Sequence, residues 1–146
     1  MALPEALTFH VEELGRQHAG LFDLLVTASG ALESGSAEAA VKALTAFRDA
    51  MLEHTATEEA LMEESRYPDR GRHRMAHEVF LADLQQLLIQ LSAAGLAPQL
   101  EEALRIRLPE WLHFHVEVND APLARFLAKR PPPKLAARRG ARSNVS

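Results

Sequence analysis

Apolar residues recur at intervals of three and four along much of the chain, the spacing that places side chains on one face of a helix. Residues 1–11 lack this pattern and contain Pro4, so we expect an irregular arm there. The first predicted helix runs from Val11 to Gly30, just before a Ser-Gly-Ser cluster typical of a loop. Its repeating face consists of Leu14, His18, Leu21, Phe22, Leu25 and Ala28.

A second helix is predicted to follow Ser36, a residue type that favours the N-cap position, and to run to about Ser65. Its inner face carries Val41, Leu44, Phe47, Met51, His54, Glu58 and Leu61. Pro68 lies in the turn that ends it, and a third helix is predicted from residue 69 or 70 to about residue 94. Gly95 is a suitable C-cap for that helix. Its inner face carries His73, His77, Phe80, Leu81, Leu84, Leu87, Leu88 and Leu91.

A fourth helical region is predicted from Pro98 onward, with a less regular pattern than the first three. Pro109 lacks a backbone N–H and therefore predicts a kink or a restart of the helix. Residues 110–118 are predicted to be helical. Pro122 follows an Asn-Asp pair, which predicts a capped break before a short final helix ending at Leu127.

The pattern as a whole predicts an all-α protein, an antiparallel up-down four-helix bundle joined by short loops. No run of alternating β-branched residues indicates a sheet. We place one bundle domain at residues 1–130 and a basic, flexible tail at residues 131–146, because the tail has three prolines and no apolar stripe.

Composition agrees with one globular domain: the chain has 146 residues, of which 47% are hydrophobic and 25% charged. No apolar run reaches the roughly 18 residues needed to span a membrane, and the N-terminus does not resemble a signal peptide. The absence of cysteine excludes disulfides and thiolate metal sites. These features lead us to expect a cytoplasmic protein.

The net charge of −4 hides a division between the body and the tail. Ten Lys and Arg residues stand against twenty acidic residues in residues 1–128, which argues against a nucleic-acid-binding face on the domain. The basic residues of the last eighteen positions are Lys129, Arg130, Lys134, Arg138, Arg139 and Arg142.

Two pairs of polar residues on the apolar helix faces indicate a metal site. His54 and Glu58 are four residues apart, as are His73 and His77, so each pair lies one helical turn apart on one face. The turn between the two helices lets the second pair return and face the first. Burying such groups without partners costs several kcal/mol, and a metal ion removes that cost by accepting their lone pairs.

The fourth helical region offers two ways to complete this site. His113 and Glu117 form one pair, whereas His115 and Asp120 are five residues apart across the predicted break. The face of His115 is apolar, so we favour His115 and expect His113 at the surface and His10 in the N-terminal arm. The apolar residues on the favoured face are Leu108, Trp111, Leu112 and Val118.

Five histidines and two carboxylates are too many ligands for one ion but suit two. Imidazole-rich sites with bridging carboxylates suit iron and, less specifically, zinc or manganese. Ferritin-like di-iron proteins carry a Glu-x-x-His motif on two helices. This chain contains that motif once, from Glu110 to His113, so the ferritin-like family fits poorly.

Five segments of the chain form a recognisable ordered set: Gln17-His18-Ala-Gly-Leu21, His54-Thr-Ala-Thr-Glu58-Glu59-Ala-Leu-Met62, Tyr67-Pro68, His73-Arg-Met-Ala-His77 and Trp111-Leu112-His113-Phe114-His115-Val-Glu-Val-Asn-Asp120. Through these segments, residues 9–128 resemble bacterial hemerythrin-like domains (bacteriohemerythrins), and the first segment resembles their first-helix motif.

The resemblance implies two iron ions. His73, His77 and His115 would hold one, and His18 and His54 the other. Glu58 and Asp120 would bridge them, together with an oxo or hydroxo group. Counting ligands on this scheme leaves the first iron six-coordinate and the second five-coordinate. The vacant position on the second iron is the open site that a small ligand needs.

The chain departs from the family pattern at two positions. Gly15 stands where the family has an acid three residues before the first-helix histidine, so an outer partner for His18 is missing. Leu123 stands three residues after the bridging aspartate, where an aromatic residue is common. Neither departure removes a ligand.

The function implied by the resemblance is reversible dioxygen binding, for transport, storage or sensing, rather than catalysis. We expect Trp111, Leu112 and Val116 to cover the open position and dioxygen to be the ligand. An unidentified protein partner or a reductase is compatible with this interpretation. One alternative is a di-iron enzyme that acts on peroxide, nitric oxide or ferrous iron. Another is a helical interaction module whose histidines are structural or hold zinc.

Overall fold

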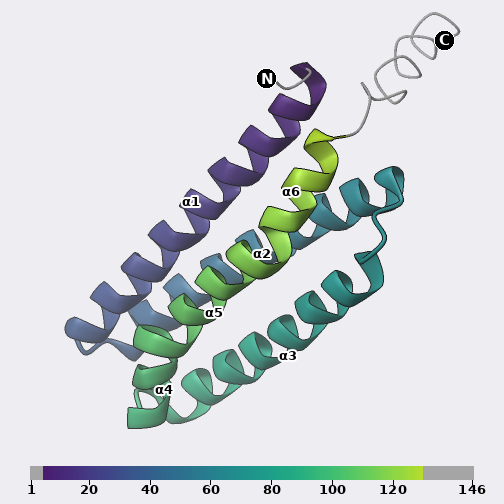
Figure 1. Cartoon of the computed structure of the whole chain (residues 1–146). Coiled ribbons are helices and arrows are strands. Elements are labelled where there is room, and N and C mark those ends of the chain that lie inside the picture. Colours follow the sequence, from purple (N-terminus) through teal and green to yellow (C-terminus); the bar gives the residue numbers. More distant parts are fainter. Residues whose placement is uncertain (1–4, 130–146) are drawn as a thin grey trace, which may run out of the picture.

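The computed structural model describes the backbone of residues 5–129 and the side chains of residues 12–129. These residues form four antiparallel helical rods (Figure 1), which confirms the predicted all-α bundle. The first three rods are α1 (Glu5–Glu33), α2 (Ala37–Ser65) and α3 (Arg70–Ala94). The fourth runs without a loop through α4 (Pro98–Glu102), η1 (Ala103–Arg107), α5 (Leu108–His115), η2 (Val116–Asp120) and α6 (Ala121–Ala128).

The predicted ends of α2 and α3 are confirmed by their caps. The Ser36 side chain accepts a hydrogen bond from the Ala39 backbone N–H at 3.1 Å, so it is the N-cap of α2. Arg66 closes α2 in the left-handed conformation, with φ of 54°. Gly95 ends α3 with φ of 74°, a backbone conformation that favours glycine.

Helix α1 is longer at both ends than the apolar pattern indicated, so the irregular arm expected over residues 1–11 is wrong for residues 5–11. Glu5, Ala6 and Leu7 are strong helix formers, and their propensity outweighs the missing apolar periodicity. The helix also continues through Gly30 to Glu33, because one interior glycine costs only about 1 kcal/mol relative to alanine.

The fourth rod contains two π-helical segments where breaks were expected. The Leu108 N–H donates to the Ala103 carbonyl and the Ala121 N–H donates to the Val116 carbonyl, both five residues back. Each bond immediately precedes a proline, whose ring would collide with the carbonyl four residues before it in a regular α-helix. The wider π turn accommodates that ring. The restart at Pro109 and the capped break before Pro122 are therefore corrected to π-helical turns in a continuous rod.

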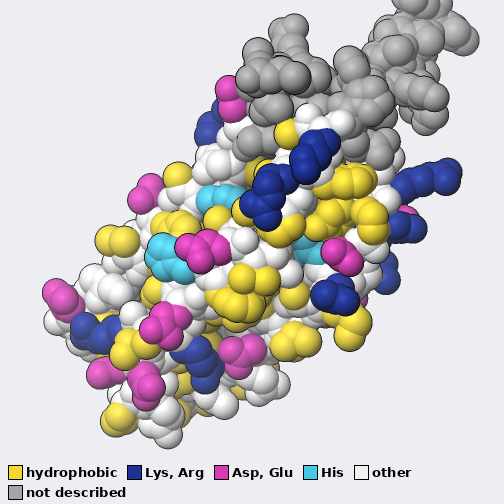
Figure 2. Space-filling view, viewed as in Figure 1, with side chains coloured by type: hydrophobic (Ala, Val, Ile, Leu, Met, Phe, Trp, Pro, Cys, Tyr) yellow, Lys and Arg dark blue, Asp and Glu magenta, His cyan; other side chains and the backbone are white. Residues whose placement is uncertain are grey.

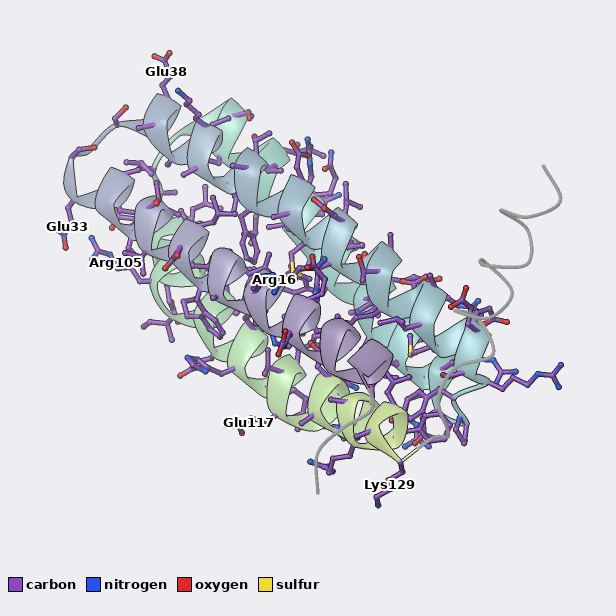
Figure 3. The ribbon with its side chains drawn as sticks, turned by 90° about the horizontal axis from the view of Figure 1, so that it is seen from above. Arg16, Glu33, Glu38, Arg105, Glu117 and Lys129 are labelled. Carbon is purple, nitrogen blue, oxygen red and sulfur yellow. The ribbon has the colours of Figure 1, made fainter. Side chains whose placement is uncertain are left out.

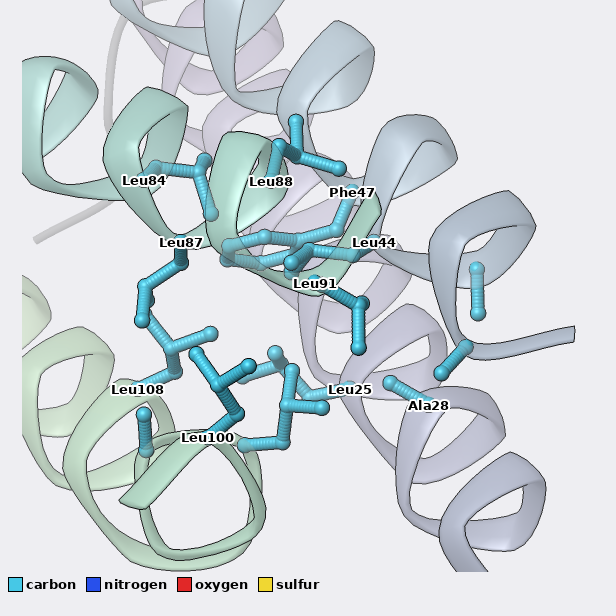
Figure 4. Packing of buried hydrophobic residues seen from close by; sticks show 14 of the residues in the cluster. Leu25, Ala28, Leu44, Phe47, Leu84, Leu87, Leu88, Leu91, Leu100 and Leu108 are labelled. Atoms are coloured by element: carbon cyan, nitrogen blue, oxygen red, sulfur yellow. The ribbon is translucent and has the colours of Figure 1, made fainter. Parts of the chain in front are cut away.

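Buried apolar side chains form two clusters at opposite ends of the bundle. The larger cluster joins all four rods (Figure 4), with Phe47 and Leu84 fully buried at its centre. The smaller cluster consists of Leu14, Leu61, Met62, Tyr67, Leu123 and Leu127. A buried polar layer separates the two, since His54 and Glu58 on α2 and His115 and Asp120 on the fourth rod fall between members of the two clusters.

The molecular surface mixes charge types. On the face in Figure 2, acidic and basic side chains are interspersed with apolar ones. None of the helices in the described part of the chain is long and apolar enough to cross a membrane. The basic tail predicted at residues 131–146 lies outside the described residues, so its flexibility and the domain boundary stay predictions.

The π turn of η2 suggests a direct test. Deleting Val118, which is 49% exposed, together with the substitution Pro122→Ala removes both the one extra residue of that turn and the ring that it accommodates, and should restore regular α-helix while Asp120 keeps facing the core. We expect the deletion variant to retain its helicity by circular dichroism and its full metal content. Inserting one alanine after Val118 should instead turn Asp120 away and lower the metal content. A deletion variant that lost as much metal as Asp120→Ala would contradict this account of the turn.

Candidate metal centre

The seven residues singled out in the sequence meet in the polar layer. Their donor atoms form two overlapping groups within 4.8 Å, and Glu58 and Asp120 belong to both. One group adds His73, His77 and His115, and the other adds His18 and His54. Six of the seven residues are at most 2% exposed, whereas the His18 side chain is 18% exposed. The arrangement therefore offers two metal positions that share two carboxylates.

The two oxygens of Asp120 are divided between these positions. Its Oδ2 lies 2.7 Å from His18 Nε2 and 3.2 Å from His54 Nε2. Its Oδ1 lies 3.0 Å from His73 Nε2 and 2.9 Å from His115 Nε2. Asp120 thus directs one oxygen toward each group of histidines.

Glu58 faces the same centre from α2. Its Oε1 lies 3.1 Å from both His54 Nε2 and His77 Nε2, and 3.3 Å from His73 Nε2. Its Oε2 is buried and has no hydrogen-bond partner among the described residues. The Oε1 atom therefore already touches histidines of both groups, and Oε2 remains available to a cation.

Several buried atoms of the centre fit a cation better than they fit one another. His77 Nε2 and His115 Nε2 lie 3.2 Å apart, and both rings turn this nitrogen toward the centre. His73 Nε2 and Asp120 Oδ1 approach to 3.0 Å, but the angles do not make a hydrogen bond, so both stay unsatisfied. An unsatisfied buried polar atom costs about 1–3 kcal/mol. Metal ions accept such lone pairs, and the donor set of imidazole and carboxylate suits iron.

Asp120 reaches the centre because of the π turn. Residues five apart do not share a face in an α-helix, but the Val116–Asp120 segment is wider by one residue and aligns Asp120 with His115. Asp120 makes no capping hydrogen bond with its side chain and is 2% exposed. His115 and Asp120 therefore lie together as expected, but a π turn aligns them rather than the break that was predicted.

Three outer residues, which the sequence analysis did not single out, hold the histidine rings. The outer Nδ1 of His54 donates to Gln17 Oε1 at 2.8 Å, and that of His77 donates to Glu59 Oε2 at 3.0 Å. The Nδ1 of His115 donates to Asn119 Oδ1, in the same rod, at 3.2 Å. These bonds fix the tautomers that leave Nε2 free to bind a metal. Each partner directly precedes or follows a predicted ligand in the chain, which is the signal that could have found it.

Opposite charges stabilise one another inside the centre. Burial alone would lower the pKa of His54 and of His73, but contacts with the Asp120 and Glu58 carboxylates outweigh it and raise the pKa of each to about 9. Burial alone would raise the pKa of Glu58 and of Asp120, but contacts with His115 and the other histidines hold both well below the usual range. Without metal, the centre is therefore a buried network of charges that need one another.

The remaining predicted residues lie around this centre. His113 is exposed and packs against Phe22, with ring centroids 4.5 Å apart. Figure 3 shows Glu117 pointing away from the bundle, so neither residue joins the site. The side chain of His10 lies outside the described residues.

The three residues expected to roof the open position have different surroundings. Trp111 stacks on His115, with centroids 4.7 Å apart, and on Phe80, with centroids 3.5 Å apart. Leu112 is fully buried in the larger apolar cluster, and Val116 is half-buried against the same cluster. Whether they line a ligand pocket stays a prediction.

Comparison with known proteins agrees with this geometry. The family model described as the hemerythrin HHE cation binding domain matches residues 10–127. A bacteriohemerythrin of Ralstonia nicotianae is 32% identical over 128 residues, which cover 88% of this chain and 89% of that protein. A bacteriohemerythrin of Stenotrophomonas maltophilia is 27% identical over 114 residues, which cover 78% of this chain and 72% of that protein.

The ligand assignment predicts that His77→Ala loses most of the bound metal. His77 is fully buried, and the other four residues of its group already serve as ligands in this assignment, so no spare histidine is available to replace it. The measurement is elemental analysis of the purified variant. His113→Ala is the matched control on the exposed side of α5 and should keep its metal. Full retention of metal in the His77 variant would remove His77 from the ligand set.

The electrostatics predict how the stability of the metal-free protein depends on pH. The raised pKa values of His54 and His73 contribute stability that is fully present below pH 6.5 and is lost as pH rises through about 9. The lowered pKa values of Glu58 and Asp120 contribute stability that is lost as the solution becomes strongly acidic. Urea denaturation of the metal-free protein should therefore show its midpoint falling steadily from about pH 6.5 to pH 9.5. The metal-loaded protein should not show this fall, because its histidines bind metal as neutral ligands.

Proposed function

The chain belongs to the hemerythrin HHE cation-binding domain family, and from that premise we propose that it binds dioxygen reversibly at a pair of iron ions. The family and the buried cluster of His, Glu and Asp residues make it a hemerythrin-like metal-binding domain. The number of ions, the oxo or hydroxo bridge between them and the dioxygen ligand are our proposal.

In this proposal His73, His77 and His115 hold one iron, and His18 and His54 hold the other. The observation that carries it is the sharing of Glu58 and Asp120 by both groups of histidines, with the oxygens of Asp120 already divided between them. Glu58 and Asp120 would supply oxygen donors to both ions. The position with three histidines would then be more fully occupied by protein donors than the position with two, which would leave room there for an exogenous ligand.

Iron held by these residues would supply reversible electron donation to a small ligand such as dioxygen. The residues of this chain hold the donors in place and limit the access of water. The larger apolar cluster reaches the centre through Leu112 and Trp111, and the ring of Trp111 covers one face of His115. A dry environment of this kind slows the escape of oxidised products, because the hydrophobic shell around a metal controls solvent access.

The roles of the titratable side chains at the centre favour reversible oxygen binding over catalysis. All seven central polar residues serve as ligands in the proposal, and the outer nitrogens of His54, His77 and His115 are held by Gln17, Glu59 and Asn119. Among the residues whose side chains the structure describes, no further titratable group at the centre is thereby left to act as a general acid or base on a substrate. Reversible binding needs no such group.

The test is a cycle of oxygenation and removal of oxygen. Protein loaded with ferrous iron under argon is exposed to air and then returned to argon, while its absorption spectrum is followed. We expect the spectral change on exposure to air to reverse under argon over several cycles, with about nine-tenths or more of its amplitude retained. Continuous oxygen consumption in the presence of a reductant would replace the carrier by an oxidase. Purification with zinc and without iron would replace both by a structural zinc module.

A further inference from the structure

The outer nitrogens of the five histidines are not held equally in the two halves of the centre. In the three-histidine half, His77 donates to the Glu59 carboxylate and His115 donates to the Asn119 side chain. His73 Nδ1 has no hydrogen-bond partner among the described residues, but the residue is 2% exposed, so burial restrains its ring. Among the described residues, this half therefore contains the one carboxylate that accepts from the outer Nδ1 of a ligand histidine.

The two-histidine half has weaker support. His54 donates to the neutral Gln17 amide, whose own N–H group donates to Thr57 Oγ1 at 3.2 Å. His18 Nε2 contacts Asp120, but its Nδ1 has no hydrogen-bond partner among the described residues. With a side chain that is 18% exposed, His18 is also the only one of the seven central residues that solvent reaches to that extent.

Outer partners of this kind alter metal affinity by a known physical route. An imidazole that donates its second N–H to a carboxylate has a fixed tautomer and a more basic metal-binding nitrogen. Loss of such a partner typically lowers metal affinity by about 10–100-fold. His18, without a partner at Nδ1, must also give up rotational freedom when it binds metal, whereas the bond to Glu59 already restrains the ring of His77.

We propose that the two halves bind metal unequally, so that the three-histidine half fills first and the His18–His54 half holds an exchangeable second ion whose affinity is limited by the missing partner at the outer Nδ1 of His18. This inference rests on the proposed pair of irons. Between the two halves, Glu58 and Asp120 serve both, so the first ion keeps three histidines and two carboxylates when the second ion leaves.

Gly15 is the position at which this weakness can be corrected. It lies three residues before His18, on the same side of α1, and is exposed. A Cβ atom added at Gly15 meets nothing within 4 Å. Side chains on a helix lean toward its N-terminus, which carries His18 toward the turn of Gly15. An acidic side chain at residue 15 therefore has both the space and the direction to accept from His18 Nδ1.

The experiment titrates metal-free protein with ferrous iron under argon and follows each binding step by calorimetry and by competition with a chelator. The wild-type chain should bind two ions in two resolved steps, and His18→Ala should lose the weaker step while keeping the tighter one. Gly15→Glu or Gly15→Asp should strengthen the weaker step by roughly tenfold and leave the tighter one unchanged. Dissociation of the second ion to the chelator should slow correspondingly.

Two controls separate the carboxylate from other effects of the substitution. Gly15→Gln keeps the length of glutamate without its charge and should strengthen the weaker step less than Gly15→Glu. Gly20→Glu places the same charge on the same helix at a site that is equally open but turned away from His18, and should leave both steps unchanged. Circular dichroism verifies that each variant is folded.

The outcomes distinguish this inference from the proposed function. Two ions bound with equal affinity, loss of both ions in His18→Ala, or no effect of either acid at residue 15 would overturn the inequality while leaving the two-iron centre intact. A wild-type chain that takes up only one ion at saturating iron would overturn the two-iron function and this inference together.

Discussion

The bundle depends on mutual compensation among seven titratable side chains buried between its rods. Neither the histidines nor the carboxylates could remain charged there alone, because burial by itself disfavours the charged form of each. Together they form a compact network in which Asp120 touches four imidazoles at distances of 2.7–3.2 Å. Each of the four rods has to place at least one of these residues in the same layer of the bundle.

The apolar clusters supply the stability that such a polar layer requires. Replacing a buried ionic network by apolar side chains often leaves stability unchanged or increases it, so the network is weak evidence of stabilisation. The larger cluster stabilises the end of the bundle with the α1–α2 and α3–α4 turns through residues such as Phe47 and Leu84. The smaller one packs the end with the α2–α3 turn around Tyr67 and Leu127. The polar layer between them sets the register of the rods, since a shift of one turn would separate Glu58 from His77.

Support around the centre decreases from the three-histidine half to His18. Glu59 gives His77 a charged acceptor, and Gln17 gives His54 a neutral one. His18, the most exposed of the seven, has none. The part of the centre closest to solvent is thus also the part held least firmly. A site that must exchange a small ligand needs such a region, and a fully held centre would resist that exchange.

The sequence by itself determined the four rods, the caps at Ser36 and Gly95, and the two polar pairs of α2 and α3. Local propensity and apolar periodicity are properties of neighbouring residues and are readable without the fold. The polarity of the two faces of α5 also favoured His115 over His113. By contrast, the early start of α1 was missed, because helix propensity acted there without an apolar stripe.

Only the tertiary structure decided the π turn that aligns Asp120 with His115, because the choice between a break and a wider turn depends on what the next residues pack against. It also decided the outer partners Gln17 and Glu59, each of which contacts a histidine on a neighbouring helix. The division of the Asp120 oxygens between the two groups is of the same kind. Apart from the contact of Asp120 with His115, these relations join residues 18–102 positions apart in the chain, and local patterns contain no record of which distant side chains will meet.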